Sequence, residues 1–174
     1  MNHLESLIAE YLDWQGYLIR RNTKVGRLPN GGWAMELDVV GYNPHTNHLV
    51  HYESSIDGHS WIERERRFTL KFDRGRDHIR EDIFSWLPHD LPIEQIAVCV
   101  THPKGRVTLG GGRLQSLDEF IAEVRHKVIA MGSANQNAIT ETYPLLRTLQ
   151  LTHCGSPRVT IVVAPIEPRT WGRR

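Results

Sequence analysis

The N-terminal part of the chain carries a hydrophobic pattern with the period of an α-helix. Five apolar residues recur at intervals of three and four positions and so share one helical face: Leu4, Leu7, Ile8, Tyr11 and Leu12. Gly16 follows, and glycine readily adopts the left-handed conformation at a helix C-terminus. The pattern predicts an amphipathic helix that ends near Gly16.

Residues 17–54 change to the period of β-strands. Three segments are rich in β-forming residues, and they are YLIRRNTKV at 17–25, MELDVVGY at 35–42 and HLVHYES at 48–54. The sequences RLPNGGW and NPHTN separate them and contain the residues that favour turns. The pattern predicts a meander of three antiparallel strands.

A helical pattern returns from about residue 61 to residue 86, and an apolar strand follows it. The helix has an apolar stripe made of Phe68, Phe72, Ile79 and Ile83, and the prolines that follow the helix would stop it. The segment IEQIAVCVTH at 93–102 is almost entirely apolar, which is typical of a central strand covered on both faces.

The remaining residues predict a more irregular order of elements. PKGRVTLGGGR at 103–113 indicates a loop or a ragged hairpin. Ser116 and Glu119 have the spacing of a capping box, which opens a helix that buries Leu117, Phe120, Ile121, Val124 and Val128. A short helix at YPLLRTLQL and a last strand at RVTIVVAP complete the order α-β-β-β-α-β-α-α-β, a single mixed α/β domain over residues 1–174.

Composition is that of an ordinary globular domain, with 40% hydrophobic and 24% charged residues among 174. No apolar run approaches the ~20 residues that a membrane helix needs, and the acidic N-terminus does not resemble a signal peptide. Two cysteines are too few for a disulfide framework, so we expect a cytoplasmic protein that does not bind membranes. Net charge is only +1, yet Arg20, Arg21, Lys24 and Arg27 form a local basic cluster that suits a polyanion.

Two of the predicted strands carry acids where apolar residues would pack better. Asp38 lies within the second strand and Glu53 at the end of the third, and a hairpin of this length can bring both side chains to one face. Converging carboxylates repel each other unless a cation lies between them, and Mg²⁺ prefers such oxygen ligands. The alternative is that both acids face solvent. If they bind a metal, hydrolysis of a phosphodiester is the natural reaction.

This succession of a helix, a basic strand, an aspartate and a hairpin into E-x-x resembles the PD-(D/E)XK nuclease superfamily, the restriction-endonuclease-like fold, and most of all its Holliday-junction-resolvase-like members. The resemblance covers about residues 4–100 and implies an α-β-β-β-α-β core with a mixed sheet flanked by helices. Residues 105–174 would be a C-terminal extension. The resemblance implies that Asp38, Glu53 and the backbone carbonyl of Ser54 bind the metal, and that Glu5 approaches it. The alternative for Glu5 is a solvent-facing position on its helix.

The chain departs from the superfamily at the third motif position, where Ser55 stands in place of lysine. Some members move this lysine to the following helix, where Lys71 is the candidate. A second stripe beside the apolar one holds Lys71 among other basic residues, namely Arg64, Arg67, Arg74 and His78. This stripe could also contact DNA phosphates or solvent. His51, two positions before Glu53, would share its face and could join the site.

Two hypotheses about function remain open at this stage. The first is a DNA nuclease that depends on Mg²⁺ or Mn²⁺, with Asp38, Glu53, Lys71 and Ser55 in its active site and Arg20, Arg21, Lys24, Arg64, Arg67 and Arg74 on DNA. The second is a degenerate nuclease domain that binds nucleic acid without cutting it, or that serves as a subunit of a DNA-processing or defence assembly. A protein-interaction module without affinity for DNA is a third alternative. Many nucleases of this fold act as homodimers, but no interface can be recognised in the sequence.

Overall fold

The structure is a computed structural model that describes residues 3–153. Its elements in chain order are α1 (His3–Trp14), β1 (Leu18–Arg27), β2 (Trp33–Asn43), β3 (His48–Ser55), α2 (Trp61–His78), η1 (Ile79–Ile83), β4 (Ile93–Cys99), β5 (Thr108–Leu109), β6 (Gly112–Ser116), α3 (Leu117–Ala130) and α4 (Pro144–His153). The last predicted strand, RVTIVVAP, lies outside the described residues. Within those residues the predicted helices and strands are confirmed in order and type, except for two regions described below.

One six-stranded sheet, in the order β1-β2-β3-β4-β6-β5, forms the centre of the fold. The first three strands pair antiparallel, as the predicted meander requires, and β3, β4 and β6 then pair parallel to one another. β4 lies inside the sheet between β3 and β6, which confirms the central position predicted from its apolar sequence. The chain is therefore mixed α/β with a mixed sheet flanked by helices, an arrangement consistent with a restriction-endonuclease-like fold.

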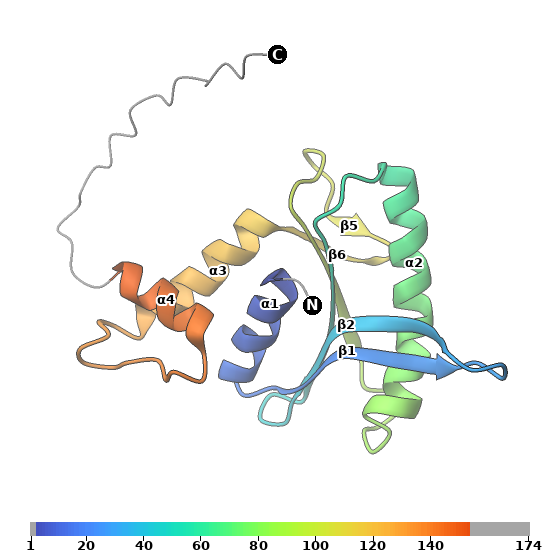
Figure 1. The fold of residues 1–174 in the computed structure, drawn as a ribbon, viewed down its shortest axis with the longest axis horizontal. Coiled ribbons are helices and arrows are strands. Elements are labelled where there is room, and N and C mark those ends of the chain that lie inside the picture. The colour runs from blue at the N-terminus through green and yellow to red at the C-terminus, as the bar shows by residue number, and fades with distance from the viewer. Residues whose placement is uncertain (1–2, 154–174) are drawn as a thin grey trace, which may run out of the picture.

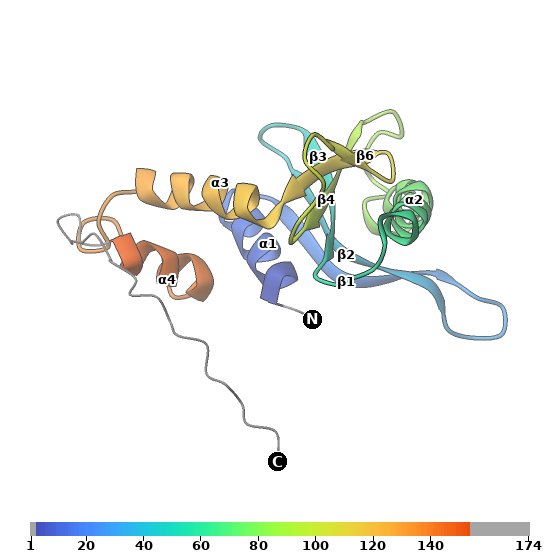
Figure 2. The same ribbon diagram turned by 90° about the horizontal axis from the view of Figure 1, so that it is seen from above.

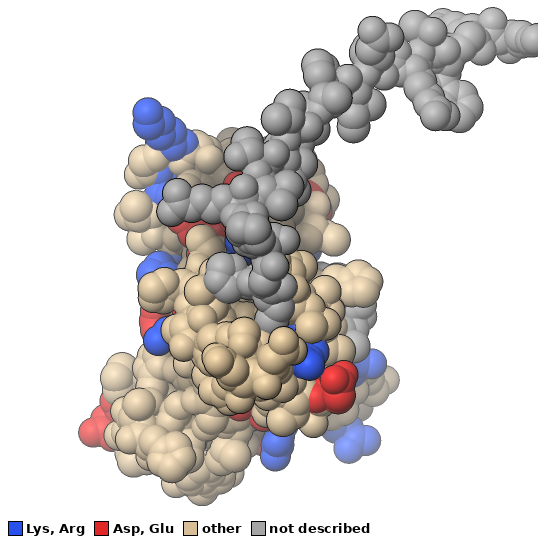
Figure 3. Space-filling model, turned by 90° about the vertical axis from the view of Figure 1, so that its left-hand side faces the viewer, with Lys and Arg blue, Asp and Glu red and all other residues tan. Residues whose placement is uncertain are grey.

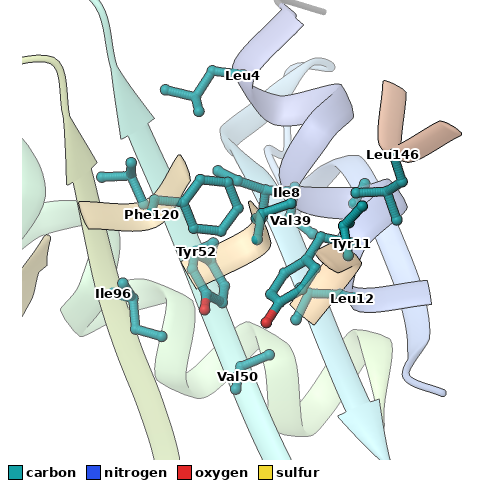
Figure 4. Close-up of a cluster of buried hydrophobic side chains, with 14 of the residues drawn as sticks. Leu4, Ile8, Tyr11, Leu12, Val39, Val50, Tyr52, Ile96, Phe120 and Leu146 are labelled. Carbon is teal, nitrogen blue, oxygen red and sulfur yellow. The ribbon is translucent and has the colours of Figure 1, made fainter. Parts of the chain in front are cut away.

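The helices cover the two faces of the sheet unequally. α1, α3 and α4 lie on one side and α2 lies alone on the other (Figures 1 and 2). On the three-helix side, Ile8, Tyr52 and Phe120 belong to one buried cluster, in which α1, β3 and α3 meet (Figure 4). The rings of Tyr11 and Phe120 pack edge to face, with centroids 5.8 Å apart. This core is built from the apolar stripes that the sequence predicts.

The side covered by α2 holds the polar site. Phe68 and Phe72 of α2 pack against Ala97 and Leu114 of the sheet. Successive side chains of a strand point to opposite faces, so along β3 the side chain of Tyr52 enters the three-helix core while that of His51 turns to α2. The His51 ring packs edge to face on Phe72, with centroids 5.3 Å apart. The residues that follow His51 at intervals of two share this face.

The first difference from the predicted elements concerns the long helix. Regular α-helix ends at His78, and the chain continues as one π-helical turn, Ile79–Ile83. The amide of Phe84 donates to the carbonyl of Ile79 at 2.8 Å, a bond five residues long. The wider turn brings Ile79 and Phe84 to one side, and both are buried in the same cluster. Periodicity alone predicts 3.6 residues per turn throughout, so it misses this turn.

The second difference concerns the glycine-rich segment after β4. It forms the ragged hairpin predicted as one alternative, but its second strand, β6, also joins the main sheet beside β4. Gly112 makes this possible, because a Cβ there would lie 2.5 Å from the Phe72 ring and 2.8 Å from the Gln95 carbonyl oxygen. The capping box predicted at Ser116 and Glu119 is confirmed at the start of α3.

The outer surface on the α4 side carries little organised charge. Where grey atoms do not cover it, this face is mostly uncharged, with scattered basic and acidic side chains (Figure 3). Among residues 3–153, no helix is long and apolar enough to cross a membrane.

Candidate active site

The two acids of the predicted hairpin lie side by side. The backbone amide of Asp38 donates a hydrogen bond to Glu53 Oε1 at 3.2 Å, which joins β2 and β3 at this point. Both residues are buried, and the Glu53 side chain has no exposed surface at all. The predicted juxtaposition is therefore confirmed, and the alternative of two solvent-facing acids is wrong.

Each carboxylate has one oxygen held by nearby donors. Asp38 Oδ2 accepts from the amide of Ser54 at 2.8 Å and from its hydroxyl at 3.1 Å. Glu53 Oε1 accepts from the Asp38 amide and lies 2.9 Å from His51 Nε2. The second oxygens, Asp38 Oδ1 and Glu53 Oε2, meet at one point, which is the Lys71 ammonium. The site thus has two anchored oxygens and two that converge on a cation.

Lys71 reaches this point from α2, across the face of the sheet. Its Nζ lies 3.0 Å from Asp38 Oδ1 and also donates to Glu53 Oε2. The Lys71 side chain is 28% exposed, so most of its surface is covered by the neighbouring strands and helix. The sequence-based prediction that this lysine points at the acid pair is confirmed in geometry.

The electrostatics of the three groups follow from burial and mutual charge. Burial raises the pKa of Asp38, and the neighbouring charge of Glu53 raises it further. Burial would also raise the pKa of Glu53, but hydrogen bonds from His51 and Lys71 outweigh burial and lower it. Burial would lower the pKa of Lys71, yet the charges of the two acids outweigh it and raise that pKa. Lys71 is therefore a stable ammonium at neutral pH, and Asp38 is the acid that more readily takes a proton.

A chain of buried polar side chains begins at Glu53 Oε1, on the side away from Lys71, and runs through His51 to Gln95. His51 has no exposed surface, and its Nδ1 lies 3.3 Å from Nε2 of Gln95 on β4. Gln95 also contacts Phe72 and Arg76 of α2. Sequence reasoning had included His51 but missed Gln95 and Arg76. The available signal was the amide side chain of Gln95 in a strand whose other residues, apart from Glu94, are apolar.

Two other predicted ligands contact the edges of the site. Ser54 contributes its amide and hydroxyl to Asp38, while the role predicted for its carbonyl stays a prediction. Glu5 accepts a hydrogen bond at 3.1 Å from the side chain of Asn22. Asn22 lies between two registered pairs of β1 and β2, next to Asp38 across the strands. The role of Glu5 as a metal ligand also stays a prediction.

Ser55, the residue predicted from the resemblance to stand in place of a lysine, is buried at the end of β3. Its side chain is 6% exposed and follows Glu53 by two residues, so it turns toward the α2 side. The ammonium that contacts the two acids belongs to Lys71 on α2.

The predicted DNA-binding residues divide into two groups. Arg64 is 7% exposed, its guanidinium lies over the Trp61 ring at 5.0 Å, and it donates to the Asp57 carbonyl. This corrects the prediction that Arg64 faces DNA, because its charge is used to hold the loop before α2. The other five predicted residues are exposed, and they are Arg67 and Arg74 on α2 and Arg20, Arg21 and Lys24 on the edge strand β1.

A shallow hollow of about 350 Å³ opens beside the acid pair. It lies between β2 and α2 and is lined by Ala34, Met35, Glu36, Asp38, Arg67, Leu70 and Lys71. Arg67 is 44% exposed and forms an ion pair with Asp57 at 3.0 Å. The hollow thus gives a solvent-borne anion access to two cationic side chains next to the carboxylates.

The donor set suits a hard divalent cation. Two carboxylate oxygens already converge on a positive charge, and oxygen ligands are those that Mg²⁺ and Mn²⁺ prefer. No cluster of three or more His, Cys, Asp or Glu side chains arranged to bind a metal occurs in residues 3–153. Two carboxylates would therefore need backbone or water oxygens to complete the coordination.

Comparison of the chain with protein-family models, with curated proteins and with solved structures gave no match.

Proposed function

We propose that this protein is a metal-dependent nuclease that hydrolyses phosphodiester bonds of DNA. The observation that carries the proposal is the convergence of Asp38 Oδ1, Glu53 Oε2 and the Lys71 ammonium at the edge of an open hollow. Two acids and one lysine in this arrangement match the chemistry of the PD-(D/E)XK superfamily, which the order of motifs also resembles. The lysine that Ser55 replaces in the strand would then be supplied by Lys71.

In this proposal the two oxygens that contact Lys71, Asp38 Oδ1 and Glu53 Oε2, would hold Mg²⁺ or Mn²⁺. The bound ion would lower the pKa of a water molecule and neutralise charge on the phosphate. The anchored oxygens keep the carboxylates in place, because Ser54 and His51 hold them from behind. Lys71, whose raised pKa keeps it charged, would stabilise negative charge that develops on the phosphate rather than act as a base.

The exposed basic residues suit the same substrate. Arg67 lines the hollow, and Arg74 lies two turns of α2 further on, so both could contact phosphates that flank the cleaved bond. A domain with one such site cuts one strand at a time, so cutting both strands would involve two copies. A homodimer on DNA therefore belongs to this proposal.

A second function is favoured by one specific observation. The Lys71 ammonium directly contacts both acids, so it offsets one of their two negative charges without a metal. Two acids held by a lysine in this way could be retained in a domain that binds DNA without cutting it, or in a subunit of a larger DNA-processing assembly. That alternative predicts DNA binding that does not depend on divalent ions.

Cleavage assays separate the two functions. Purified protein is incubated with plasmid, single-stranded and branched DNA in Mg²⁺ or Mn²⁺, together with the Asp38→Ala and Lys71→Met variants. The nuclease proposal expects cleavage by the wild type and a loss of at least about 100-fold in both variants. Lys104→Met, at an exposed lysine outside the site, serves as the matched control and should cleave normally. Equal inactivity of the wild type and Asp38→Ala on all substrates, with DNA binding retained, would establish the second function instead.

A further inference from the structure

The hydrogen bonds behind Glu53 have defined directions. Gln95 Nε2 lies 2.8 Å from the carbonyl oxygen of Phe72, and a carbonyl can only accept. The other end of the amide, Gln95 Oε1, receives a hydrogen bond from the guanidinium of Arg76, which can only donate. Two independent partners therefore fix which end of the Gln95 amide is the nitrogen.

This orientation determines the tautomer of His51. Gln95 Nε2 has two hydrogens, one bonded to Phe72 and one directed at His51 Nδ1, 3.3 Å away. Since the amide nitrogen donates, Nδ1 must accept and carries no hydrogen. The hydrogen of the imidazole is then on Nε2, which lies 2.9 Å from Glu53 Oε1. The histidine thus donates to the carboxylate, and the carboxylate accepts.

The surroundings leave the His51 ring little freedom to turn. It has no exposed surface and packs edge to face on Phe72. Gly75 of α2 lies directly against it, because a Cβ at that position would be 2.7 Å from His51 Cε1. The helix therefore approaches closely enough at a glycine to confine the imidazole between α2 and the sheet.

We infer that His51 is a positioning residue, held by Gln95 as the Nε2–H tautomer, that fixes Glu53 Oε1 so that Oε2 faces the cation position. Donors at Oε1 come from two sides, the His51 ring and the Asp38 amide. With this oxygen occupied, the other is directed at Lys71. Mutation of a residue that hydrogen-bonds to a metal-binding carboxylate and orients it typically lowers metal affinity 10- to 100-fold.

The first part of the test needs no metal. Protein labelled with ¹⁵N in histidine is studied by two-bond ¹H–¹⁵N correlation NMR, and the His51→Gln variant identifies the His51 signals by their absence. The expected result is a protonated Nε2 and an unprotonated Nδ1. A His51 with its hydrogen on Nδ1, or on both nitrogens, would overturn the inference whatever the protein does to DNA.

The second part measures Mn²⁺ affinity by calorimetry and rests on the proposed function, because it requires a metal at Glu53. Glutamine at position 51 can place an N–H near the position of Nε2, whereas asparagine is one methylene shorter and cannot. We expect His51→Gln to stay within a few-fold of the wild type and His51→Asn to bind 10- to 100-fold more weakly. Equal affinity of His51→Asn and the wild type would contradict a positioning role.

His48→Gln is the matched control for this comparison. His48 lies on the same strand but faces the opposite side, where it contacts Glu94 and Tyr17. Its replacement should leave Mn²⁺ affinity unchanged. If the wild type binds no Mn²⁺, the proposed function fails, and the NMR measurement alone decides whether His51 is held as described.

Discussion

Lys71 Nζ lies 3.0 Å from Asp38 Oδ1, although 33 positions separate the two residues in the chain. The same amine contacts Glu53, so one side chain of α2 joins the acids of two neighbouring strands. It supplies a positive charge where Ser55 cannot. The positive charge of the site is therefore carried by a helix, and it offsets one of the two negative charges of the acids.

Removing that amine should make stability depend on divalent metal. In Lys71→Ala the two acids face each other without a cation, which should lower the free energy of unfolding by about 3 kcal/mol in metal-free buffer. A divalent ion would take the place of the amine, and saturation at 100 times its dissociation constant restores about 2.7 kcal/mol. Differential scanning fluorimetry with EDTA or Mn²⁺ measures both changes.

The control for this experiment is Lys104→Ala, which should show the small metal response of the wild type. In the wild type Lys71 competes with the metal, so the Mn²⁺-induced rise in Tm should be smaller than in Lys71→Ala. If Mn²⁺ raised the Tm of the wild type and of Lys71→Ala equally, the result would contradict a cation site at the two acids.

Gly75→Ala should destabilise the protein, although alanine is the better helix former. In an open helix the change would stabilise by about 1 kcal/mol. Here the new Cβ would lie 2.7 Å from His51, and because the ring is confined, we expect a net loss of about 1–3 kcal/mol. Urea unfolding measures the difference. In Gly58→Ala the new Cβ meets no atom within 4 Å. The urea concentration at the midpoint of unfolding should therefore be nearly the same for this variant as for the wild type.

The capping box of α3 predicts a pH dependence of stability. The amide of Ser116 donates to the Glu119 carboxylate at 2.7 Å, and this bond lowers the pKa of Glu119 below its ordinary value of 4.5. A group whose pKa is lowered in the folded state stabilises it above its ordinary pKa and loses that effect as pH falls through the lowered value. The Tm difference between wild type and Glu119→Gln should therefore be largest near neutral pH and shrink below about 4.5.

The arginines of α2 should separate into a structural and a binding group. Arg64→Ala should lower the free energy of unfolding by about 1–3 kcal/mol, because it removes the contacts with Trp61 and the Asp57 carbonyl. Arg67→Ala and Arg74→Ala change exposed side chains, so they should leave stability nearly unchanged. Each should weaken DNA binding and reduce the slope of log affinity against log salt by about 1. Chemical unfolding and fluorescence anisotropy at several salt concentrations distinguish the groups.

Much of the fold could be predicted because its elements depend on neighbouring residues. The apolar stripe of α1, the turns between the first three strands and the capping box at Ser116 are all local features, and each is confirmed. The π-helical turn after His78 was missed because it depends on burying Ile79 and Phe84 together. The pairing of β6 with β4 was missed because it requires the close approach at Gly112.

The sequence by itself determined that Asp38 and Glu53 lie on neighbouring strands joined by a short hairpin, which allows both side chains to reach one face. The structure decided that this face is buried and not exposed to solvent. Tertiary structure alone decided which basic residue would join them. Arg64 and Lys71 lie on the same stripe of one helix, yet the way α2 packs on the sheet buries Arg64 beside Trp61 and brings Lys71 to the acids. It also decided that Gln95, from a strand far along the chain, would reach His51. Contacts between separate elements depend on how those elements pack, which local patterns do not encode.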